Sequence, residues 1–113
     1  MNELVLPGWA KEWVDSNADL GGHRWVALLR RSTASWENAL KFPVGCVVRE
    51  VSAHNFGVVI GYDQNVGAVL VADRPEPTLC PVRRVKPECI EVAAYHKWST
   101  PEIVARQLFG GSG

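Results

Sequence analysis

The sequence predicts an α+β protein in which a small antiparallel barrel lies between helical segments. Residues 1–43 carry apolar side chains at helical spacing, and residues 44–93 contain short runs rich in valine and isoleucine. Residues 99–109 form a short amphipathic pattern. We therefore expect one domain over residues 1–109, with N-terminal helices, a five-stranded barrel and a C-terminal helix, followed by a flexible tail at residues 110–113.

Length and composition are those of a globular domain. The chain has 113 residues, of which 47% are hydrophobic and 21% charged, and its formal net charge is +0. One domain is the common solution at this length. A balanced charge lowers the expectation of a dedicated nucleic-acid or anionic-membrane binder. We expect a cytoplasmic protein without membrane contact, because neither a secretory pattern nor a membrane-spanning apolar run is visible.

The three cysteines, Cys46, Cys80 and Cys89, lie in apolar strand-like runs and lack the spacing of a zinc site. This pattern favours small buried thiols in a reducing compartment. His54 and His96 add no ligand set. We expect neither a metal nor a cofactor.

Two apolar stripes predict helices in residues 1–43. The first follows Pro7, which can occupy the first turn of a helix, and consists of Trp9, Ala10, Trp13 and Val14. The second consists of Trp25, Leu28, Leu29, Ser32, Trp36 and Leu40. Its spacing fits one long helix, or two short helices that break near residues 32–35, where hydroxyl groups compete for backbone partners. A strand at residues 24–29 is the other possibility. Pro43 ends the segment.

Short runs separated by turn residues predict the strands. Their starts lie 10 or 11 residues apart, and the runs are Cys46–Val51, Phe56–Tyr62, Gly67–Asp73, Thr78–Arg84 and Cys89–Ala93. Five strands are too few for two sheets, so we expect one strongly bent sheet that closes on itself. Gly57 and Gly61 suit the bulges and coiling of such a sheet. Pro81 cannot donate a ladder hydrogen bond, which places the fourth strand at an edge or a bulge.

The C-terminal pattern predicts a capped helix over residues 99–109. Ser99-Thr100-Pro101-Glu102 offers a hydroxyl cap, an early proline and an acidic side chain at the positive end of the helix. The apolar stripe consists of Ile103, Val104, Gln107 and Leu108. Gly110 would stop the helix.

A pattern of glycines and valines runs through residues 44–93. It begins with Val44-Gly45-x-Val47-Val48, continues as Phe56-Gly57-Val58-Val59-x-Gly61 and ends in Pro87-Glu88-Cys89-Ile90-Glu91-Val92. This pattern resembles an SH3-like small barrel. In outline it is similar to KOW-type modules, a likeness that implies RNA or protein contact by analogy of fold. It also resembles, loosely, the plasmid-borne type II dihydrofolate reductases, which share the Gly-x-x-Val-Arg start. Their Val-Gln-Ile-Tyr stretch is absent here, so neither activity nor site is carried over.

A basic cluster near the end of the fourth run is the candidate binding site. Its centre is Arg83, Arg84 and Lys86, which Arg49 and Arg74 would approach if the sheet closes. Beside an aromatic ring, such a cluster would bind a phosphate backbone and stack a base. The binding residues that we predict are Arg49, Tyr62, Arg83, Arg84, Lys86 and Trp98. In the competing interpretation this is a solvated strand end, with Glu76, Glu88 and Glu91 available to pair.

The tryptophans of the helical stripes are expected mainly in the core, and any exposed remainder would mark a self-association surface or a partner groove. His23, His54 and His96 lie in no recognisable catalytic motif, so we predict no catalytic residue. The leading hypothesis is a binding module that contacts a protein, a peptide or a second copy of itself. Nucleic-acid binding through the local basic patch, and an oligomeric enzyme with a site at a subunit junction, are the alternatives.

Overall fold

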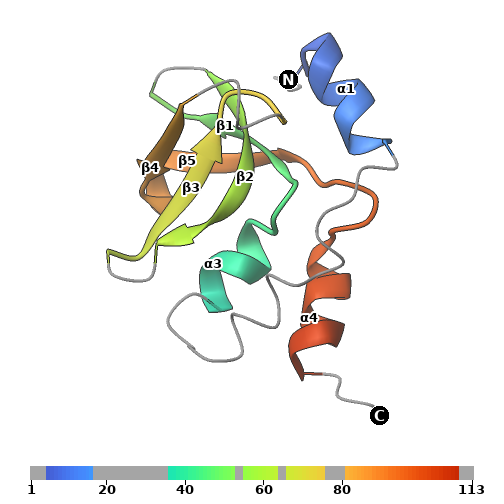
Figure 1. Cartoon of the computed structure of the whole chain (residues 1–113), viewed down its shortest axis with the longest axis vertical. Helices are drawn as coiled ribbons and strands as arrows, with labels where there is room; N and C mark the ends of the chain where they lie inside the picture. The colour runs from blue at the N-terminus through green and yellow to red at the C-terminus, as the bar shows by residue number, and fades with distance from the viewer. Residues whose placement is uncertain (1–4, 17–35, 53–54, 64–65, 76–80, 110–113) are drawn as a thin grey trace.

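The computed structural model describes residues 5–16, 36–52, 55–63, 66–75 and 81–109. Along these residues, three helices lie beside and below one five-stranded antiparallel sheet in the view of Figure 1. The protein is therefore α+β, which confirms the fold class that the sequence predicts. Within these ranges no helix is long and apolar enough to cross a membrane.

Strands that follow one another along the chain are neighbours in the sheet, except that the last strand pairs with the first. The strands are β1 (Val47–Glu50), β2 (Phe56–Asp63), β3 (Ala68–Ala72), β4 (Val82–Val85) and β5 (Ile90–Ala94). Their order in the sheet is β4-β3-β2-β1-β5, so the last strand lies beside the first. A 3-10 turn, η4 (Pro87–Cys89), carries the chain from β4 to β5. This order is compatible with a small barrel-like fold.

The expected strand runs match the observed strands, with one displacement. The fourth strand begins at Val82, inside the expected run, and ends one residue beyond it at Val85; residues 78–80 of that run lie outside the described part of the chain. β4 is an edge strand, as predicted from Pro81. The register between β2 and β3 shifts between Val59 and Gly61, which places a bulge where the second glycine of the run predicts one.

Gly57 has a different role from the predicted bulge. It pairs regularly with Val48 of β1. A Cβ at this position would lie 2.5 Å from Cγ1 of Val71 and 2.8 Å from the carbonyl oxygen of Ala72. Glycine is needed here because the side chain of Val71 and the backbone of Ala72 in β3 leave no room for a Cβ.

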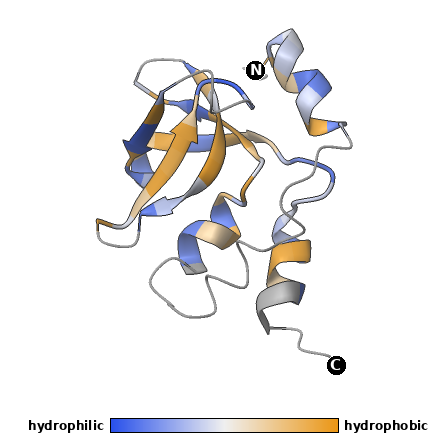
Figure 2. Ribbon diagram, viewed as in Figure 1, coloured by the Kyte–Doolittle hydropathy of each residue, from blue (hydrophilic) through white to orange (hydrophobic). Residues whose placement is uncertain are grey.

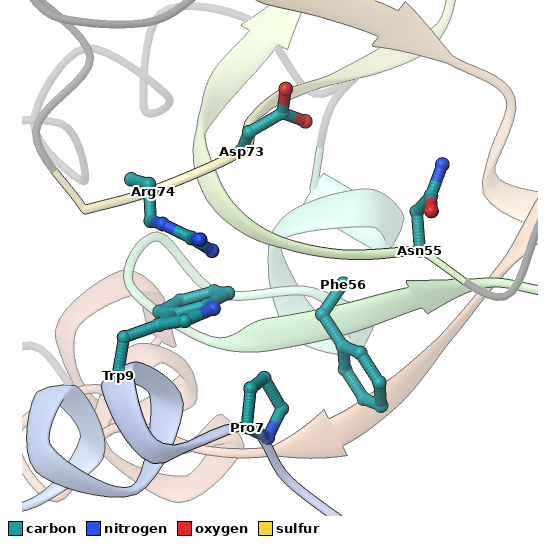
Figure 3. Close-up of a pocket in the computed structure, with 6 residues that line it drawn as sticks. All are labelled: Pro7, Trp9, Asn55, Phe56, Asp73 and Arg74. Carbon is teal, nitrogen blue, oxygen red and sulfur yellow. The ribbon is translucent and has the colours of Figure 1, made fainter.

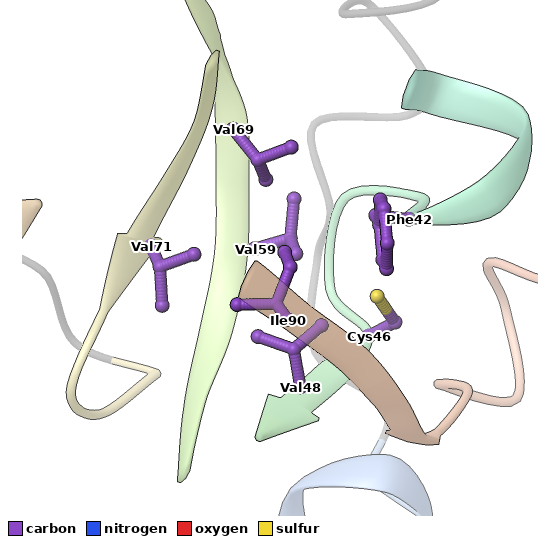
Figure 4. Close-up of a cluster of buried hydrophobic side chains, with 7 residues drawn as sticks. All are labelled: Phe42, Cys46, Val48, Val59, Val69, Val71 and Ile90. Atoms are coloured by element: carbon purple, nitrogen blue, oxygen red, sulfur yellow. The ribbon is translucent and has the colours of Figure 1, made fainter. Parts of the chain in front are cut away.

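The main core fills the concave side of the sheet (Figure 4). It consists of Phe42, Cys46, Val48, Val59, Val69, Val71 and Ile90. β-Branched side chains dominate it because they fit the pleated surface of a strand. Figure 2 shows the apolar residues along β2 and β3, whereas β4 carries hydrophilic ones.

Three helices accompany the sheet in the described ranges: α1 (Gly8–Val14), α3 (Trp36–Lys41) and α4 (Pro101–Phe109). α1 lies beside one end of the sheet, and α3 and α4 pack against each other below it in the view of Figure 1. Ala39 and Val104 form the small core between α3 and α4. The hydroxyl of Thr100 accepts a hydrogen bond from the Ile103 amide at 3.3 Å, which confirms the predicted cap.

α1 begins one residue later than the sequence suggests. Pro7 has an extended backbone, with φ −62° and ψ 157°, and precedes the helix as its N-cap. Its carbonyl accepts hydrogen bonds from the amides of Ala10 and Lys11. The predicted stripe nevertheless faces the protein: Ala10 is fully buried. Of the second predicted stripe, the backbone of Trp36 onward forms α3, and residues 17–35 lie outside the described part.

The cysteines do not all follow the prediction of buried thiols. Cys46 is buried in the main core, but Cys89 is exposed, because it ends the 3-10 turn and does not belong to β5. Burial of Cys46 raises the pKa of its thiol, since a thiolate would lose its hydration there. Cys80 lies outside the described residues.

Candidate functional site

A cleft of about 490 Å³ opens where α1 meets one end of the sheet (Figure 3). Its lining residues are Pro7, Trp9, Asn55, Phe56, Asp73 and Arg74. They come from three parts of the chain: the start of α1, the start of β2 and the end of β3. The volume falls within the roughly 300–1,000 Å³ that is typical of ligand sites.

The pairing of β2 with β3 places two of these parts together. The strands are antiparallel, and Val58 is paired with Ala72. Phe56 lies two residues before Val58, and Arg74 lies two residues after Ala72. They therefore share one end of the sheet. The amide of Glu50 donates to the carbonyl of Asn55 at 2.8 Å, which closes the turn from β1 into β2 beside the cleft.

α1 is fixed over this end of the sheet by its second half. The indole N–H of Trp13 donates to the carbonyl of Gly45 at 2.7 Å. The amide of Lys97 donates to the carbonyl of Val14 at 3.0 Å. Trp9 lies one helical turn before Trp13, on the same side of the helix, so the docking of α1 brings Trp9 into the wall of the cleft.

The cleft combines apolar surfaces with polar groups at its rim. Pro7, Trp9 and Phe56 are half-buried, whereas Asn55 and Arg74 are exposed. The guanidinium carbon of Arg74 lies 4.9 Å from the centroid of the Trp9 ring (Figure 3). This is a cation–π contact, and it orders the arginine without removing it from solvent.

The carboxylate of Asp73 is held by a neighbouring strand. Its Oδ1 accepts a hydrogen bond from Nη2 of Arg83 at 2.8 Å, and Nη1 of the same arginine donates to Oε1 of Glu50 at 2.6 Å. The hydrogen bond to Glu50 is the largest cause that raises the pKa of Arg83. The hydrogen bond from Arg83 to Glu50 joins β4 to β1, although β3 and β2 lie between them in the sheet. The sheet is therefore strongly bent.

The predicted basic cluster is divided in the structure. Arg83 and Arg84 are neighbours in β4 and therefore point to opposite faces. Arg84 Nε donates to Oδ2 of Asp63 at 2.7 Å, and Arg49 pairs with Glu91. The three predicted arginines are thus each bound to a carboxylate. Of the partners expected in the competing interpretation, Glu91 pairs with Arg49, and Glu76 lies outside the described residues.

Two of the predicted binding residues do share a smaller hollow of about 330 Å³. It is lined by Glu50, Ser52, Arg84, Val85, Lys86 and Cys89. The basic side chains there lie opposite a carboxylate that already binds Arg83. This hollow is therefore less positive than the sequence cluster suggests.

The two predicted aromatic residues have different surroundings. The hydroxyl of Tyr62 donates to the carbonyl of Phe42 at 2.6 Å, and burial raises the pKa of the phenol well above 10.0. Tyr62 is accordingly a structural residue. Trp98 is 51% exposed, and Nζ of Lys97 lies 5.4 Å from the centroid of its ring. It follows β5 and lies apart from the arginines of β4 in the sequence.

The sequence contains little that could have revealed the cleft. Helical spacing predicts Trp9 in the core, and the sequence places Arg74 only beside the basic cluster. Asn55, Phe56 and Asp73 read as ordinary turn and strand residues. They become a site through strand register and helix docking, which no local motif encodes.

A serine and a histidine also meet outside the cleft. Nε2 of the buried His96 lies 3.2 Å from Oγ of Ser16. The amide of Trp98 donates to Nδ1 of His96 at 3.1 Å, so Nδ1 carries the lone pair and the neutral ring holds its proton on Nε2. A ring in this tautomer donates to Ser16 and cannot accept its proton. The pair therefore lacks the arrangement of a nucleophile and its base.

Along the described ranges, no group of three or more histidine, cysteine or acidic side chains is arranged to hold a metal ion. Comparison of the chain with protein-family models, with curated proteins and with solved structures finds no match.

Proposed function

We propose that this protein is a binding module whose SH3-like barrel presents a cleft for a short extended peptide, rich in proline, from a partner protein. The observation that carries the proposal is the cleft between α1 and the sheet, with Pro7, Trp9 and Phe56 as its apolar surfaces and Asn55 and Arg74 at its rim.

The chemistry of the cleft supports this class of ligand. A proline-rich segment adopts an extended helix without internal hydrogen bonds, so its carbonyl groups need outside donors. Its proline rings pack well on aromatic surfaces, which is how aromatic-lined grooves recognise such segments. Trp9 and Phe56 supply the rings. The side-chain amide of Asn55 and the guanidinium of Arg74 are exposed hydrogen-bond donors beside these rings.

The strand order supports the assignment to an SH3-like barrel. The first four strands follow one another around the sheet, and the fifth returns to pair with the first. The bulge near Gly61 and the bridge from Arg83 to Glu50 accompany the strong bending that a small barrel needs.

Nucleic-acid binding remains the alternative prediction, and the ion pairs make it the weaker one. Arg49, Arg83 and Arg84 would each have to leave a carboxylate before contacting a phosphate. An affinity built on such contacts would fall steeply with salt concentration. A cleft that buries apolar rings would bind with little salt dependence.

Fluorescence anisotropy with a labelled decaproline peptide, blocked at both ends, tests the proposal. A panel of ten-residue peptides with two to five prolines widens the search. We expect saturable binding that Trp9→Ala weakens at least tenfold, since a large aromatic ring at the centre of an interface often contributes about 2 kcal/mol or more. Arg74→Ala, at an exposed position, should weaken it without affecting the fold.

Trp98→Ala is the matched control, because it removes an exposed tryptophan outside the cleft. It should leave peptide binding unchanged. The proposal fails if no peptide of the panel binds, or if Trp9→Ala and Trp98→Ala bind equally well. Salt-sensitive binding to single-stranded RNA, lost in Arg84→Ala and Lys86→Ala, would instead support the alternative.

A further inference from the structure

One wall of the cleft belongs to a helix that is attached at its far end. Pro7 and Trp9 stand at the start of α1, whereas its last turn is held by the Trp13 bond to Gly45 and by the chain after β5. Ser16, just beyond the helix, meets His96, and the carbonyl of Val14 accepts from the Lys97 amide. The junction around His96 is thus one of two attachments that fix the position of the wall, beside the bond from Trp13 to Gly45.

His96 occupies the centre of this junction. Its side chain is fully buried, although it is an ionisable group. Its ring lies 5.0 Å from the ring of Trp13, with an interplanar angle of 56°. Nε2 donates to Ser16, and Nδ1 accepts from the Trp98 amide. Both nitrogens of the neutral ring therefore form hydrogen bonds.

Protonation would break this arrangement at one defined atom. A protonated imidazole carries a hydrogen on both nitrogens. Nδ1 would then point an N–H group at the N–H of Trp98, and the hydrogen bond would be replaced by repulsion. The backbone turn from His96 to Ser99 and the adjoining bond from Lys97 to Val14 would lose their support.

We propose that His96 is a pH-sensitive latch for the cleft: its protonation releases the end of α1 and so loosens the wall formed by Pro7 and Trp9. The latch is a property of the free protein. Its effect on peptide binding rests on the function proposed above.

The charges around the ring set the direction of the response. Desolvation is the main cause that lowers the pKa of His96 below 6.5, and the ammonium group of Lys97 lowers it further. The carboxylate of Asp15, from the end of α1, opposes this shift. A released imidazole would regain an ordinary pKa near 6.5. The released state therefore binds more protons, and release becomes more favourable as the pH falls from about 6.5 toward the lower pKa of the docked ring.

Hydrogen exchange of the free protein, followed by NMR at pH 7.5 and pH 5.5, tests the latch. Protection factors, corrected for the intrinsic pH dependence of exchange, should fall at least fivefold in acid for the amides of Lys97 and Trp98. The amide of Val59, which donates to Cys46 inside the barrel, should keep its protection. The same NMR titration should give His96 a pKa below 6.5 with the proton on Nε2 in the neutral ring.

His96→Asn is the diagnostic variant. An asparagine oxygen can accept from the amide two residues ahead, as the imidazole nitrogen does here, but it does not titrate. The variant should retain protection at pH 7.5 and lose the acid response. His23→Asn, which removes a different histidine, should retain the response. Equal protection of the wild-type amides at both pH values would overturn the proposal, as would a His96 pKa at or above 6.5.

Blocked decaproline then links the latch to binding, because this peptide has no titratable group. Its affinity for the wild type should fall at least threefold from pH 7.5 to pH 5.5 and stay constant for His96→Asn. If decaproline and the other peptides fail to bind at pH 7.5, the function proposed above is wrong. The hydrogen-exchange experiment still tests the latch, because it uses the free protein. If decaproline binds equally at both pH values while exchange responds, the link to the cleft is wrong.

Discussion

At the scale of single residues, Gly45 connects the N-terminal helix to the sheet. Its φ is 98°, a conformation that side chains with a Cβ rarely adopt. In this conformation its amide donates to the carbonyl of Val59 at 2.8 Å, while its carbonyl accepts from the indole of Trp13. One backbone unit thus holds β2 on one side and α1 on the other.

Gly45→Ala should lower the free energy of unfolding by about 1–3 kcal/mol, the cost of a strained backbone conformation at a non-glycine residue. Urea denaturation followed by circular dichroism measures this loss. Gly8→Ala is the matched control, since a Cβ there meets nothing within 4 Å and lies at the start of a helix. The control should be neutral or slightly stabilising. Equal effects of the two substitutions would contradict the role of the Gly45 backbone.

The cysteines should differ in reactivity. The attacking species is the thiolate, and burial raises the pKa of Cys46 far above the experimental range, whereas Cys89 is exposed. In a Cys80→Ser background at pH 8, a thiol reagent should label one cysteine rapidly in the native protein and both after unfolding. Cys89→Ser should abolish the rapid phase. Rapid labelling of two thiols in the native protein would show that Cys46 is accessible.

At the scale of the elements, two glycines of β2 look alike in the sequence but meet different surroundings. A Cβ on Gly57 would collide with β3, whereas a Cβ on Gly61 would make an ordinary contact, 3.5 Å from Cδ1 of Leu70. The close approach of β3 to Gly57 lets β2 and β3 coil tightly around the core valines. The bulge beside Gly61 resets the register without requiring such an approach.

Gly57→Ala should therefore destabilise the protein by about 1–3 kcal/mol, the usual effect of overpacking. Gly61→Ala should change the free energy of unfolding by less than about 0.5 kcal/mol, the range of substitutions that disturb no packing. Thermal and urea unfolding of both variants, compared with the wild type, provide the measurement. A larger loss of stability for Gly61→Ala than for Gly57→Ala would mean that the bulge, and not the close approach of β3 to Gly57, requires a glycine.

At the scale of the whole molecule, Tyr62 joins the two hydrophobic clusters. Its side chain packs against the main core of the sheet and also against the small core between α3 and α4. Its hydroxyl donates to the carbonyl of Phe42, which lies between α3 and β1. α3 and α4 therefore share their packing with the sheet.

We expect the protein to unfold in one cooperative transition. Far-ultraviolet circular dichroism, which reports on helix and sheet, and tryptophan fluorescence should give coincident urea curves. Tyr62→Phe should shift both curves together by about 1–3 kcal/mol, because it leaves a buried carbonyl without its donor. Two separate transitions, or a shift of only one probe, would show that the helices and the sheet unfold independently.

The elements of this fold were largely predictable from the sequence, and their physical causes are local. Runs of valine and isoleucine between turn residues define β1, β2, β3 and β5, and the hydroxyl before Pro101 defines the start of α4. The boundaries that shifted, at β4 and at Cys89, lie next to prolines, where chain direction depends on tertiary packing as well as on local preference.

The site depended instead on long-range geometry. Arg83 and Arg84 are adjacent in the sequence, but the pleat of a strand sends them to opposite faces, and acidic residues of other segments bind both. Trp9, Phe56 and Arg74 are far apart in the sequence, but strand register and the docking of α1 bring them to one cleft. Local preferences suffice to specify an α+β chain with short strands, because they act between near neighbours. Which side chains meet at a surface follows only from how those elements pair and pack.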